Sequence, residues 1–336
     1  MRNVLFSLIV AIATLGATSS AGQKPKWQDP CKHEVRFVTV EDGVKLEVLD
    51  WGGSGHPLVL LAGLGKSAHV FDGFAEKLTD SYHVYGISRR GYGASSQPAS
   101  GYTEQRLAQD DLRVFHALKL TAPVVGGHSV AGNELSELGI PHYGRIGGLV
   151  YLDALNDGAD DYTDYDALTA KLPEAMRKRP SPSQEDLRSF QAFCEWRRRT
   201  DGIAVPEAEF RNEFAENPDG SVGNYKIPAY VPQAIMAGGG KHDYSQIRVP
   251  VLAFVGFPGL PQDQIRQDHV TDAEERMVIA AVYGSYVGMT KIRIKRINAA
   301  AGGARVVELW GADHFVFLSN EAEVVEGLRA FVSGLH

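Results

Sequence analysis

The sequence predicts an α/β fold in which a doubly wound, mainly parallel sheet carries a helical cap inserted between two of its strands. Short apolar runs alternate with amphipathic helical segments up to residue 154, the alternation stops over residues 155–247, and it resumes from residue 248. Alternating strands and helices are typical of parallel sheets covered by helices on both faces. The 336 residues, 44% hydrophobic and 22% charged, suffice for one large domain with an insertion.

The first part of the sheet opens with a hairpin. Residues 35–50 alternate apolar and polar side chains on either side of Asp42-Gly43, which predicts two strands joined by a tight turn. The continuous apolar run at 57–61 is typical of a strand buried on both faces. Helical periodicity and further apolar runs then predict helices at 70–78, 105–118 and 135–142, and strands at 82–87, 124–125 and 146–152.

The inserted segment reads differently, because it has no buried-strand signal. It contains helical stretches separated by Pro and Gly, which we expect at 167–178, 184–200 and 207–216. We therefore expect a core made of residues 22–154 and 248–336, and a helical cap over 155–247. The returning core is predicted to contain strands at 249–255 and 305–309 and helices at 272–297 and 321–333.

Residues 1–21 differ from the rest of the chain and predict a secretory signal peptide. Arg2 gives a positive start, an apolar run follows from Val4 to Gly16, and Ser19-Ser20-Ala21 has the small residues that a signal peptidase recognises. The alternative is a retained N-terminal anchor. We expect a secreted or periplasmic protein, cut after Ala21 or nearby and with no stable membrane insertion after cleavage, since no second stretch is long and apolar enough to span a bilayer.

Charge and cysteine content limit the partners and the covalent links. Removing residues 1–21 takes away one arginine and no acid, so the net charge moves from −7 to −8, which argues against nucleic acid as a partner. Cys31 and Cys194 are the only cysteines, and in an oxidising compartment we expect them to form a disulfide; the alternative is two separate buried thiols. No His/Cys cluster has the spacing of metal ligands, so we expect no metal.

The stretch Gly126-Gly127-His128-Ser129-Val130-Ala131-Gly132 follows an apolar run and precedes a helical segment. A serine between small residues at a strand-to-helix corner sits on a tight turn with its hydroxyl exposed above the sheet. The free N–H groups at such a corner favour developing negative charge. Ser129 is therefore the candidate nucleophile, with Ala131 in place of the last glycine of the pattern.

Two further loops follow strands and complete an acyl-transfer site. Leu61-Ala62-Gly63-Leu64-Gly65 can direct the N–H of Leu64 toward the nucleophile, where it would form an oxyanion hole with the N–H of Val130; the alternative is a plain strand-exit turn. His314, in Trp310-Gly311-Ala312-Asp313-His314-Phe315, follows the last strand and is the candidate base. His128 adjoins the serine and should point away from its hydroxyl, while His242 and His269 follow no sheet strand.

Together these motifs resemble the α/β-hydrolase superfamily, in its serine-nucleophile branch with an inserted cap. The resemblance spans about residues 35–335 apart from the cap, and it rests on the serine turn, the Ala62-Gly63-Leu64-Gly65 turn, the Arg90-Gly91-Tyr92-Gly93-Ala94-Ser95 loop and the Gly311-x-x-His314-Phe315 end. We interpret the Arg90 loop as scaffold. The chain departs from the family at Ala62, where histidine is usual, and at Ser88, where aspartate is usual.

The acid of the triad is open between three positions. The resemblance places it near Gly259, but no carboxylate occurs there before Asp263. Some members carry it at the end of the strand after the serine helix, which here is Asp153. An ionised group at that sheet edge is costly without a partner, and orienting His314 would give it one. We prefer Asp153 to Asp263, with Asp157 as a third option; Asp313 adjoins His314 and diverges from it.

The resemblance implies a serine hydrolase that cleaves an ester or related acyl bond of a small-molecule substrate through an acyl-enzyme intermediate, with no cofactor. The predicted signal peptide implies that this hydrolase is secreted. A peptidase or a carbon–carbon bond hydrolase with the same triad, and a non-catalytic ligand-binding protein on the same fold, are the alternatives. The cap aromatics are expected to divide between the interior of the cap and an acyl pocket. The sequence predicts neither the substrate nor the oligomeric state.

Overall fold

The structure is a computed structural model that describes residues 27–178 and 180–335. The chain divides into two units, Met1–Pro30 and Cys31–His336. Of the first unit only residues 27–30 are described, and they form no helix or strand. The predicted signal peptide at 1–21 lies outside the described residues. All elements below belong to the second unit.

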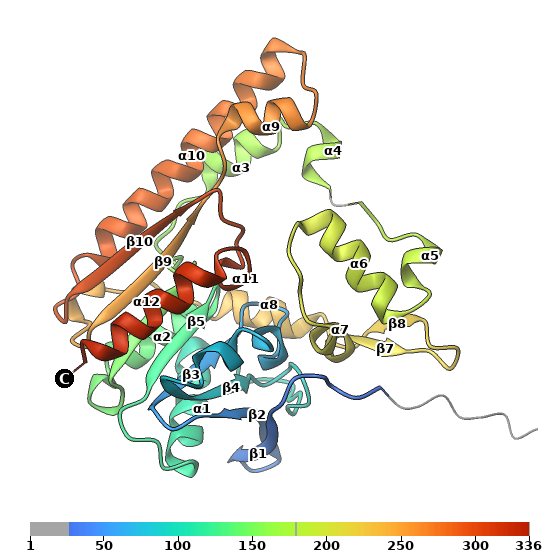
Figure 1. Cartoon of the computed structure of the whole chain (residues 1–336). Coiled ribbons are helices and arrows are strands. Elements are labelled where there is room, and N and C mark those ends of the chain that lie inside the picture. Colours follow the sequence, from blue (N-terminus) through green and yellow to red (C-terminus); the bar gives the residue numbers. More distant parts are fainter. Residues whose placement is uncertain (1–26, 179, 336) are drawn as a thin grey trace, which may run out of the picture. The chain divides into compact units, whose positions relative to one another are not determined.

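Within the described residues, eight strands form one sheet in the order β1-β2-β4-β3-β5-β6-β9-β10 (Figure 1). β1 pairs antiparallel with β2 and β2 with β4, and every other pairing is parallel. This confirms the predicted mainly parallel sheet with an opening hairpin. The strands are β1 (Glu34–Glu41), β2 (Val44–Gly52), β3 (His56–Leu61), β4 (Tyr82–Ser88), β5 (Val124–His128), β6 (Gly148–Leu152), β9 (Val251–Phe257) and β10 (Ala304–Trp310).

The central strands are buried on both faces, because their alternate side chains enter two separate cores. One core joins the sheet to α1 (Glu104–Ala117), α2 (Ala131–Gly139) and the end of α10 (Ala273–Ile297). The other joins it to α12 (Glu321–Ser333) and to the short 3₁₀ helices η1 (Ala68–Phe71) and η2 (Ala75–Leu78). Helices on both faces make the sheet doubly wound.

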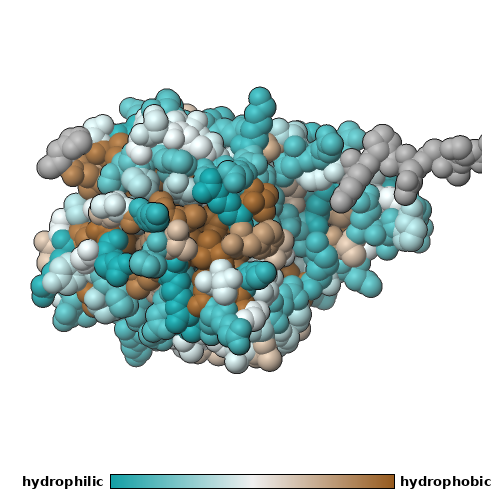
Figure 2. Space-filling model, turned by 90° about the horizontal axis from the view of Figure 1, so that it is seen from below, coloured by the Kyte–Doolittle hydropathy of each residue, from teal (hydrophilic) through white to brown (hydrophobic). Residues whose placement is uncertain are grey.

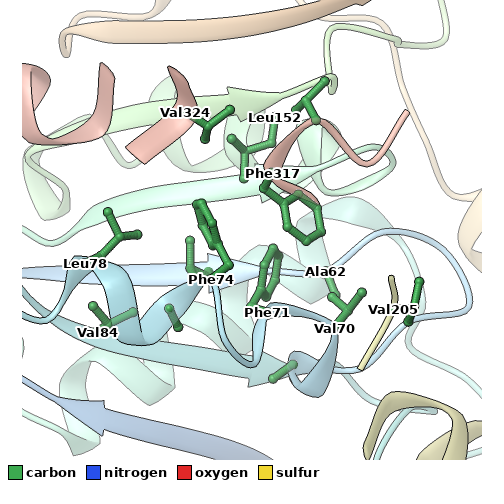
Figure 3. Packing of buried hydrophobic residues seen from close by; sticks show 14 of the residues in the cluster. Ala62, Val70, Phe71, Phe74, Leu78, Val84, Leu152, Val205, Phe317 and Val324 are labelled. Carbon is green, nitrogen blue, oxygen red and sulfur yellow. The ribbon is translucent and has the colours of Figure 1, made fainter. Parts of the chain in front are cut away.

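Figure 3 shows the second core, where Phe71 and Phe74 from the 3₁₀ helices face Phe317. The ring centroids of Phe71 and Phe317 are 4.7 Å apart, and those of Phe74 and Phe317 are 5.5 Å apart. Phe317 lies on α11 (Val316–Ser319), directly after the loop that carries His314. The same core continues into the inserted segment through residues such as Val205. This packing therefore holds together the connection between β3 and β4, which contains Phe71 and Phe74, and the segment after β10, which contains His314 and Phe317.

Between β6 and β9 the chain forms elements that lie outside the main sheet. We call residues 155–247 the cap segment; its assignment as a separate domain stays a prediction. Its elements are α3 (Thr163–Thr169), α4 (Glu174–Arg177), α5 (Gln184–Leu187), α6 (Phe190–Asp201), α7 (Glu207–Glu213), β7 (Phe214–Glu216), β8 (Val222–Tyr225), α8 (Tyr230–Ala237) and η4 (Tyr244–Gln246).

Several predicted helices are shorter than expected, for local reasons. The helix expected at 167–178 is divided into α3 and α4 because Pro173 cannot sit in a helix interior. The one expected at 184–200 divides at Ser189, whose side chain caps a new helix by accepting from the N–H of Ala192. Some short elements are not predicted, because their hydrophobic patterns span too few residues. They are the hairpin β7–β8, α8, η3 (Tyr143–Arg145) and α9 (Pro261–Gln267).

The Arg90 loop has the scaffold role that the sequence indicates. The Arg90 side chain is 1% exposed, and its Nε donates to Asp110 Oδ2 at 2.7 Å on α1. A buried guanidinium that pairs with a buried carboxylate fixes the loop after β4 to the neighbouring helix.

The surface seen from below is mainly hydrophilic, with a band of hydrophobic residues across its middle (Figure 2). Exposed apolar side chains include Phe37, Met277 and Trp310. Among the described helices, none combines the length and the apolar character needed to span a bilayer.

Candidate active site

Ser129 lies at the corner between β5 and α2, in a left-handed backbone conformation with φ of 55°. A non-glycine residue with positive φ is uncommon and strained. Its N–H donates to Leu152 O at 3.3 Å. The small neighbours are needed: a Cβ added at Gly132 would lie 1.8 Å from Ala154 O, and one at Gly127 would lie 3.0 Å from the Ala131 Cβ. The structure thus has the tight serine turn that the sequence predicts.

Asp153 is the carboxylate that meets His314. Asp153 Oδ2 lies 2.6 Å from His314 Nδ1, and Oδ1 accepts the N–H of Gly256 at 3.0 Å. Its backbone is also left-handed, with φ of 47°, and its N–H donates to Phe254 O at 2.8 Å. Both carboxylate oxygens are therefore held at the carboxyl ends of β6 and β9.

The other carboxylates have different partners. Asp263 is exposed on α9 and pairs with Arg266, and Asp157 Oδ1 accepts from Arg296 at 2.9 Å. Asp313 Oδ1 accepts the N–H of Phe315 at 2.9 Å, which turns it away from its neighbour His314. Of these candidates, the structure brings only Asp153 to His314.

His314 lines the same cavity as Ser129 and is half exposed. Within the part of the chain that the structure describes, no hydrogen bond joins the Ser129 hydroxyl to the His314 ring. Such catalytic hydrogen bonds are often long without substrate and shorten in the complex. Ser129, His314 and Asp153 follow β5, β10 and β6, and all three lie at the same edge of the sheet.

His128 supports the site from below. Its Nε2 lies 3.0 Å from the His314 carbonyl oxygen, which makes Nε2 the donor, and its ring packs 5.2 Å from Phe317. Burial lowers the pKa of His128 well below its ordinary value, so the ring stays neutral. A Cβ added at Gly63 would lie 2.7 Å from His128 Nδ1, so the ring also restricts the turn after β3 to glycine at that position.

The backbone amides of Leu64 and Val130 are available for an oxyanion. Among the described residues, neither N–H donates a hydrogen bond. The turn that carries Leu64 reaches the nucleophile, since a Cβ at Gly63 would lie 3.2 Å from the Ser129 Cβ. The two amides therefore belong to loops that meet at Ser129.

Arg89 contacts the turn after β3, which the sequence pattern does not predict. Its guanidinium donates to Ala62 O at 2.6 Å and Gly63 O at 3.1 Å, and its Nε donates to Glu134 on α2 at 3.0 Å. Arg89 is 5% exposed and Glu134 is 2% exposed. This buried contact fixes the oxyanion turn to the helix behind Ser129. The only feature of the local sequence that indicates a role for Arg89 is its position directly after a strand. Its contacts could not be predicted, because the partner residues are distant in sequence.

Two cavities meet at His314 and Asp153. The first, of about 370 Å³, is mainly apolar, and α10 contributes Ile279 and Val282 to it. The second, of about 380 Å³, contains Ser129 together with polar groups that include Thr290 and Arg293. Arg293 is paired with Asp160 at 2.8 Å, and the hydroxyl of Thr290 is buried without a hydrogen-bond partner among the described residues. Both cavities are therefore mainly apolar, and the second also contains the nucleophile candidate and Arg293.

The cap aromatics divide between the cavities and a hydrophobic core that also contains sheet residues. Tyr162 and Tyr165 line cavities at the site. The others pack in or against the core that continues from the sheet: Phe190, Phe193, Trp196, Phe210 and Phe214.

Helix α7 of the cap segment is attached to the loop after the oxyanion turn. Glu209 accepts the N–H of Ser67 at 3.0 Å and its hydroxyl at 2.6 Å, and Glu213 pairs with Lys66. Glu209 is fully buried. Burial, followed by the charge of Glu213, raises the pKa of Glu209 to about 8, against the opposing influence of Lys66 and Ser67.

The expected disulfide is absent, and this prediction is wrong: Cys31 and Cys194 are not bonded to each other. Asp72, Gly73 and Trp51 surround Cys31, whereas Glu207 and Arg211 lie near Cys194 on α6. Burial raises the pKa of each thiol to about 12, so neither is the thiolate that disulfide exchange requires. The prediction rested on the number of cysteines, and this number does not determine the distance between the two thiols in the fold.

No metal centre involves the nucleophile. Among the described residues, the groups of His, Cys, Asp and Glu that could share a metal ion include neither Asp153 nor His314.

Comparison with known proteins gives one family. The model of the alpha/beta hydrolase family matches residues 58–327. A non-heme chloroperoxidase of Streptomyces lividans is 36% identical over 101 residues, which are 30% of this chain and 37% of the relative. A bifunctional esterase/perhydrolase of Acinetobacter calcoaceticus is 30% identical over 102 residues, 30% of this chain and 37% of the relative. The chain thus spans less than half the length of the curated relatives it matches.

Among solved structures, an E-2-(acetamidomethylene)succinate hydrolase superposes with a TM-score of 0.64 at 17% sequence identity. The alignment covers 90% of this chain and 100% of that one. At this identity the likeness supports the fold and not the substrate.

The raised pKa of Glu209 predicts a pH dependence of stability. Between its ordinary value of 4.5 and about 8, the folded state holds a proton that the unfolded state releases. The free energy of unfolding should therefore fall as the pH rises through this range, by up to about 5 kcal/mol from this group. Urea unfolding from pH 5 to pH 9 should show a smaller fall for Glu209→Gln than for the wild type.

Glu195→Gln, at an exposed position of α6, is the matched control. Its free energy of unfolding should change with pH as that of the wild type does. Equal slopes for Glu209→Gln and the wild type would contradict the assignment.

Proposed function

The chain belongs to the alpha/beta hydrolase family, and from this premise we propose that it hydrolyses an ester or a related acyl bond with Ser129 as nucleophile, His314 as base and Asp153 as the orienting acid. The observation that carries the proposal is the 2.6 Å contact between His314 Nδ1 and Asp153 Oδ2 at the mouth of the cavity that contains Ser129. A carboxylate on Nδ1 keeps the other ring nitrogen available to accept a proton.

The first half-reaction forms an acyl-enzyme. Ser129 Oγ attacks the carbonyl carbon while its proton passes to His314 Nε2, and Asp153 stabilises the imidazolium. The negative charge on the former carbonyl oxygen is held by the N–H groups of Leu64 and Val130. His314 then donates its proton to the leaving oxygen, and the alcohol departs.

The second half-reaction consumes water. His314 Nε2 removes a proton from a water molecule, whose oxygen attacks the acyl carbon of the Ser129 ester. Collapse of the second tetrahedral intermediate breaks the bond to Ser129 Oγ, which takes the proton back. The products of this half-reaction are a carboxylic acid and the free enzyme.

The two cavities support a division of the substrate. The cavity lined by Ile279 and Val282 would take the acyl group, and the cavity that contains Arg293 and Thr290 would take the leaving group. The cap segment would close over the acyl group, because Tyr165 lines the first cavity. Export of the mature enzyme, with cleavage after Ala21, completes the proposal and is motivated by the composition of residues 1–21.

Ser129→Ala should abolish ester hydrolysis while the fold survives. Loss of the nucleophile should reduce kcat by on the order of 10⁴-fold or more. A fluorophosphonate probe should label the wild type at Ser129 and leave the variant unlabelled. Ser221→Ala, in the exposed hairpin, should keep the activity and the labelling. A wild type that takes no label would instead support a non-catalytic binding protein.

Asp153→Asn should impair catalysis far more than Asp263→Asn. Replacing the acid that orients His314 should cost about 10³–10⁴-fold in kcat. Asp263 lies on the surface of α9, so its replacement should leave kcat/KM within about twofold. Both variants should give the wild-type circular dichroism spectrum. The opposite ranking would assign the acid to Asp263.

Ile279→Trp should shorten the acyl chain that the enzyme accepts. The larger ring would fill part of the apolar cavity, so kcat/KM for p-nitrophenyl octanoate should fall about tenfold or more relative to the acetate. Met277→Trp, on the exposed side of the same helix, is the control and should not change the ratio. An unchanged ratio in Ile279→Trp would place the acyl group elsewhere.

A further inference from the structure

A second group of reactive side chains lies outside both cavities of the active site. Cys31 and His33 immediately precede β1, while Asp72 ends the 3₁₀ helix η1. One ligand atom from each of these three residues lies within 4.8 Å of the others. A sulfur, a ring nitrogen and a carboxylate oxygen form a donor set that suits zinc better than magnesium or calcium, which prefer oxygen alone.

The geometry of His33 points to a ligand between it and Asp72. The side chain of His33 is 5% exposed, and its Nδ1 lies 3.3 Å from Asp72 Oδ1. Nδ1 forms this ion pair with Asp72 but no well-aligned hydrogen bond within the described chain. A buried ring nitrogen without a hydrogen bond is rare and costly. A tetrahedral zinc ion, with ligands about 2.0–2.1 Å away, separates a nitrogen from an oxygen ligand by about 3.3 Å.

Asp72 is oriented as the carboxylate ligands of metal sites are. Trp51 Nε1 donates to its Oδ1 at 3.0 Å, and His69 Nδ1 lies 3.1 Å from its Oδ2. The other nitrogen of His69 lies 3.6 Å from Glu47 Oε1. A hydrogen-bonded outer layer of this kind fixes ligand direction and raises metal affinity.

We propose that Cys31, His33 and Asp72 bind one zinc ion, with the fourth coordination position open to the surface. A recess of about 570 Å³ borders Cys31 and His33 and would admit a water molecule as the fourth ligand. Zinc binding would break the S–H bond of Cys31, because a coordinating thiol is deprotonated, and would release that proton to solvent.

The zinc ion would join the segment before β1 to the 3₁₀ helix beyond β3. These two segments are brought together by the fold and are not adjacent in sequence, so the metal would act as a cross-link that stabilises the folded state. The same thiol would then be unavailable for a disulfide with Cys194.

The test uses the purified full-length protein. Native mass spectrometry after addition of zinc should show one ion per chain, and a competing chelator should give the affinity. Cys31→Ser should weaken zinc binding by more than about 100-fold. Cys194→Ser is the matched control, because it removes the other thiol and leaves the three ligands intact.

Two further readouts distinguish a built site from adventitious binding. Cobalt(II) should give a thiolate-to-metal charge-transfer absorption in the wild type and in Cys194→Ser, but not in Cys31→Ser. Saturating zinc should raise the Tm of the wild type by about 5 °C and leave that of Cys31→Ser unchanged. His33→Gln serves as the second variant if Cys31→Ser does not fold.

Equal zinc affinity in Cys31→Ser and the wild type would overturn the proposal. So would a Cys31–Cys194 disulfide in the exported protein, or the absence of a one-to-one zinc complex.

Discussion

The site depends on a backbone constraint: two neighbouring parallel strands, β5 and β6, are each followed directly by a non-glycine residue of left-handed conformation. Such a residue costs roughly 1–3 kcal/mol, which the surroundings must offset. Ser129 is held by its hydrogen bond to Leu152, and Asp153 by its hydrogen bond to Phe254 and by the amide of Gly256. Because the strands are adjacent and parallel, both sharp turns lie at one edge of the sheet, where His314 can reach them.

Buried polar contacts hold the loops that these turns require. Arg89 links the carbonyls of the oxyanion turn to the helix behind Ser129, and His128 links the serine corner to the loop of His314. Phe317 packs under the same loop. None of these three residues carries the proposed chemistry. They hold the loops that carry the reacting atoms in fixed positions relative to the strands. The geometry of the site therefore depends largely on buried residues that take no part in the reaction.

Ser129, Asp153 and His314 could be predicted because each follows a recognisable strand, and the ends of parallel strands meet at one edge. The two-faced burial of β3, β5, β6 and β9 was equally readable from apolar runs. Contacts between distant segments were not, because no local pattern encodes them: the Arg89 contacts, the cluster at Cys31 and the separation of the two thiols are of this kind. The hairpin β7–β8 was missed because its strands are short and mostly exposed.

Because α7 is attached to Ser67 and Lys66, the cap segment has two parts that should tolerate sequence changes to different degrees. One part is α7, and the other contains α3 and α4. Substitutions or insertions around α7 would disturb the loop that carries Leu64, the proposed oxyanion donor, so selection should retain the length and the acids of α7. Helices α3 and α4 touch the apolar cavity through Tyr165, Leu172 and Met176, yet neither supplies a group to the triad. Substitutions in α3 and α4 can therefore change the range of substrates during evolution without changing the geometry of the proposed triad.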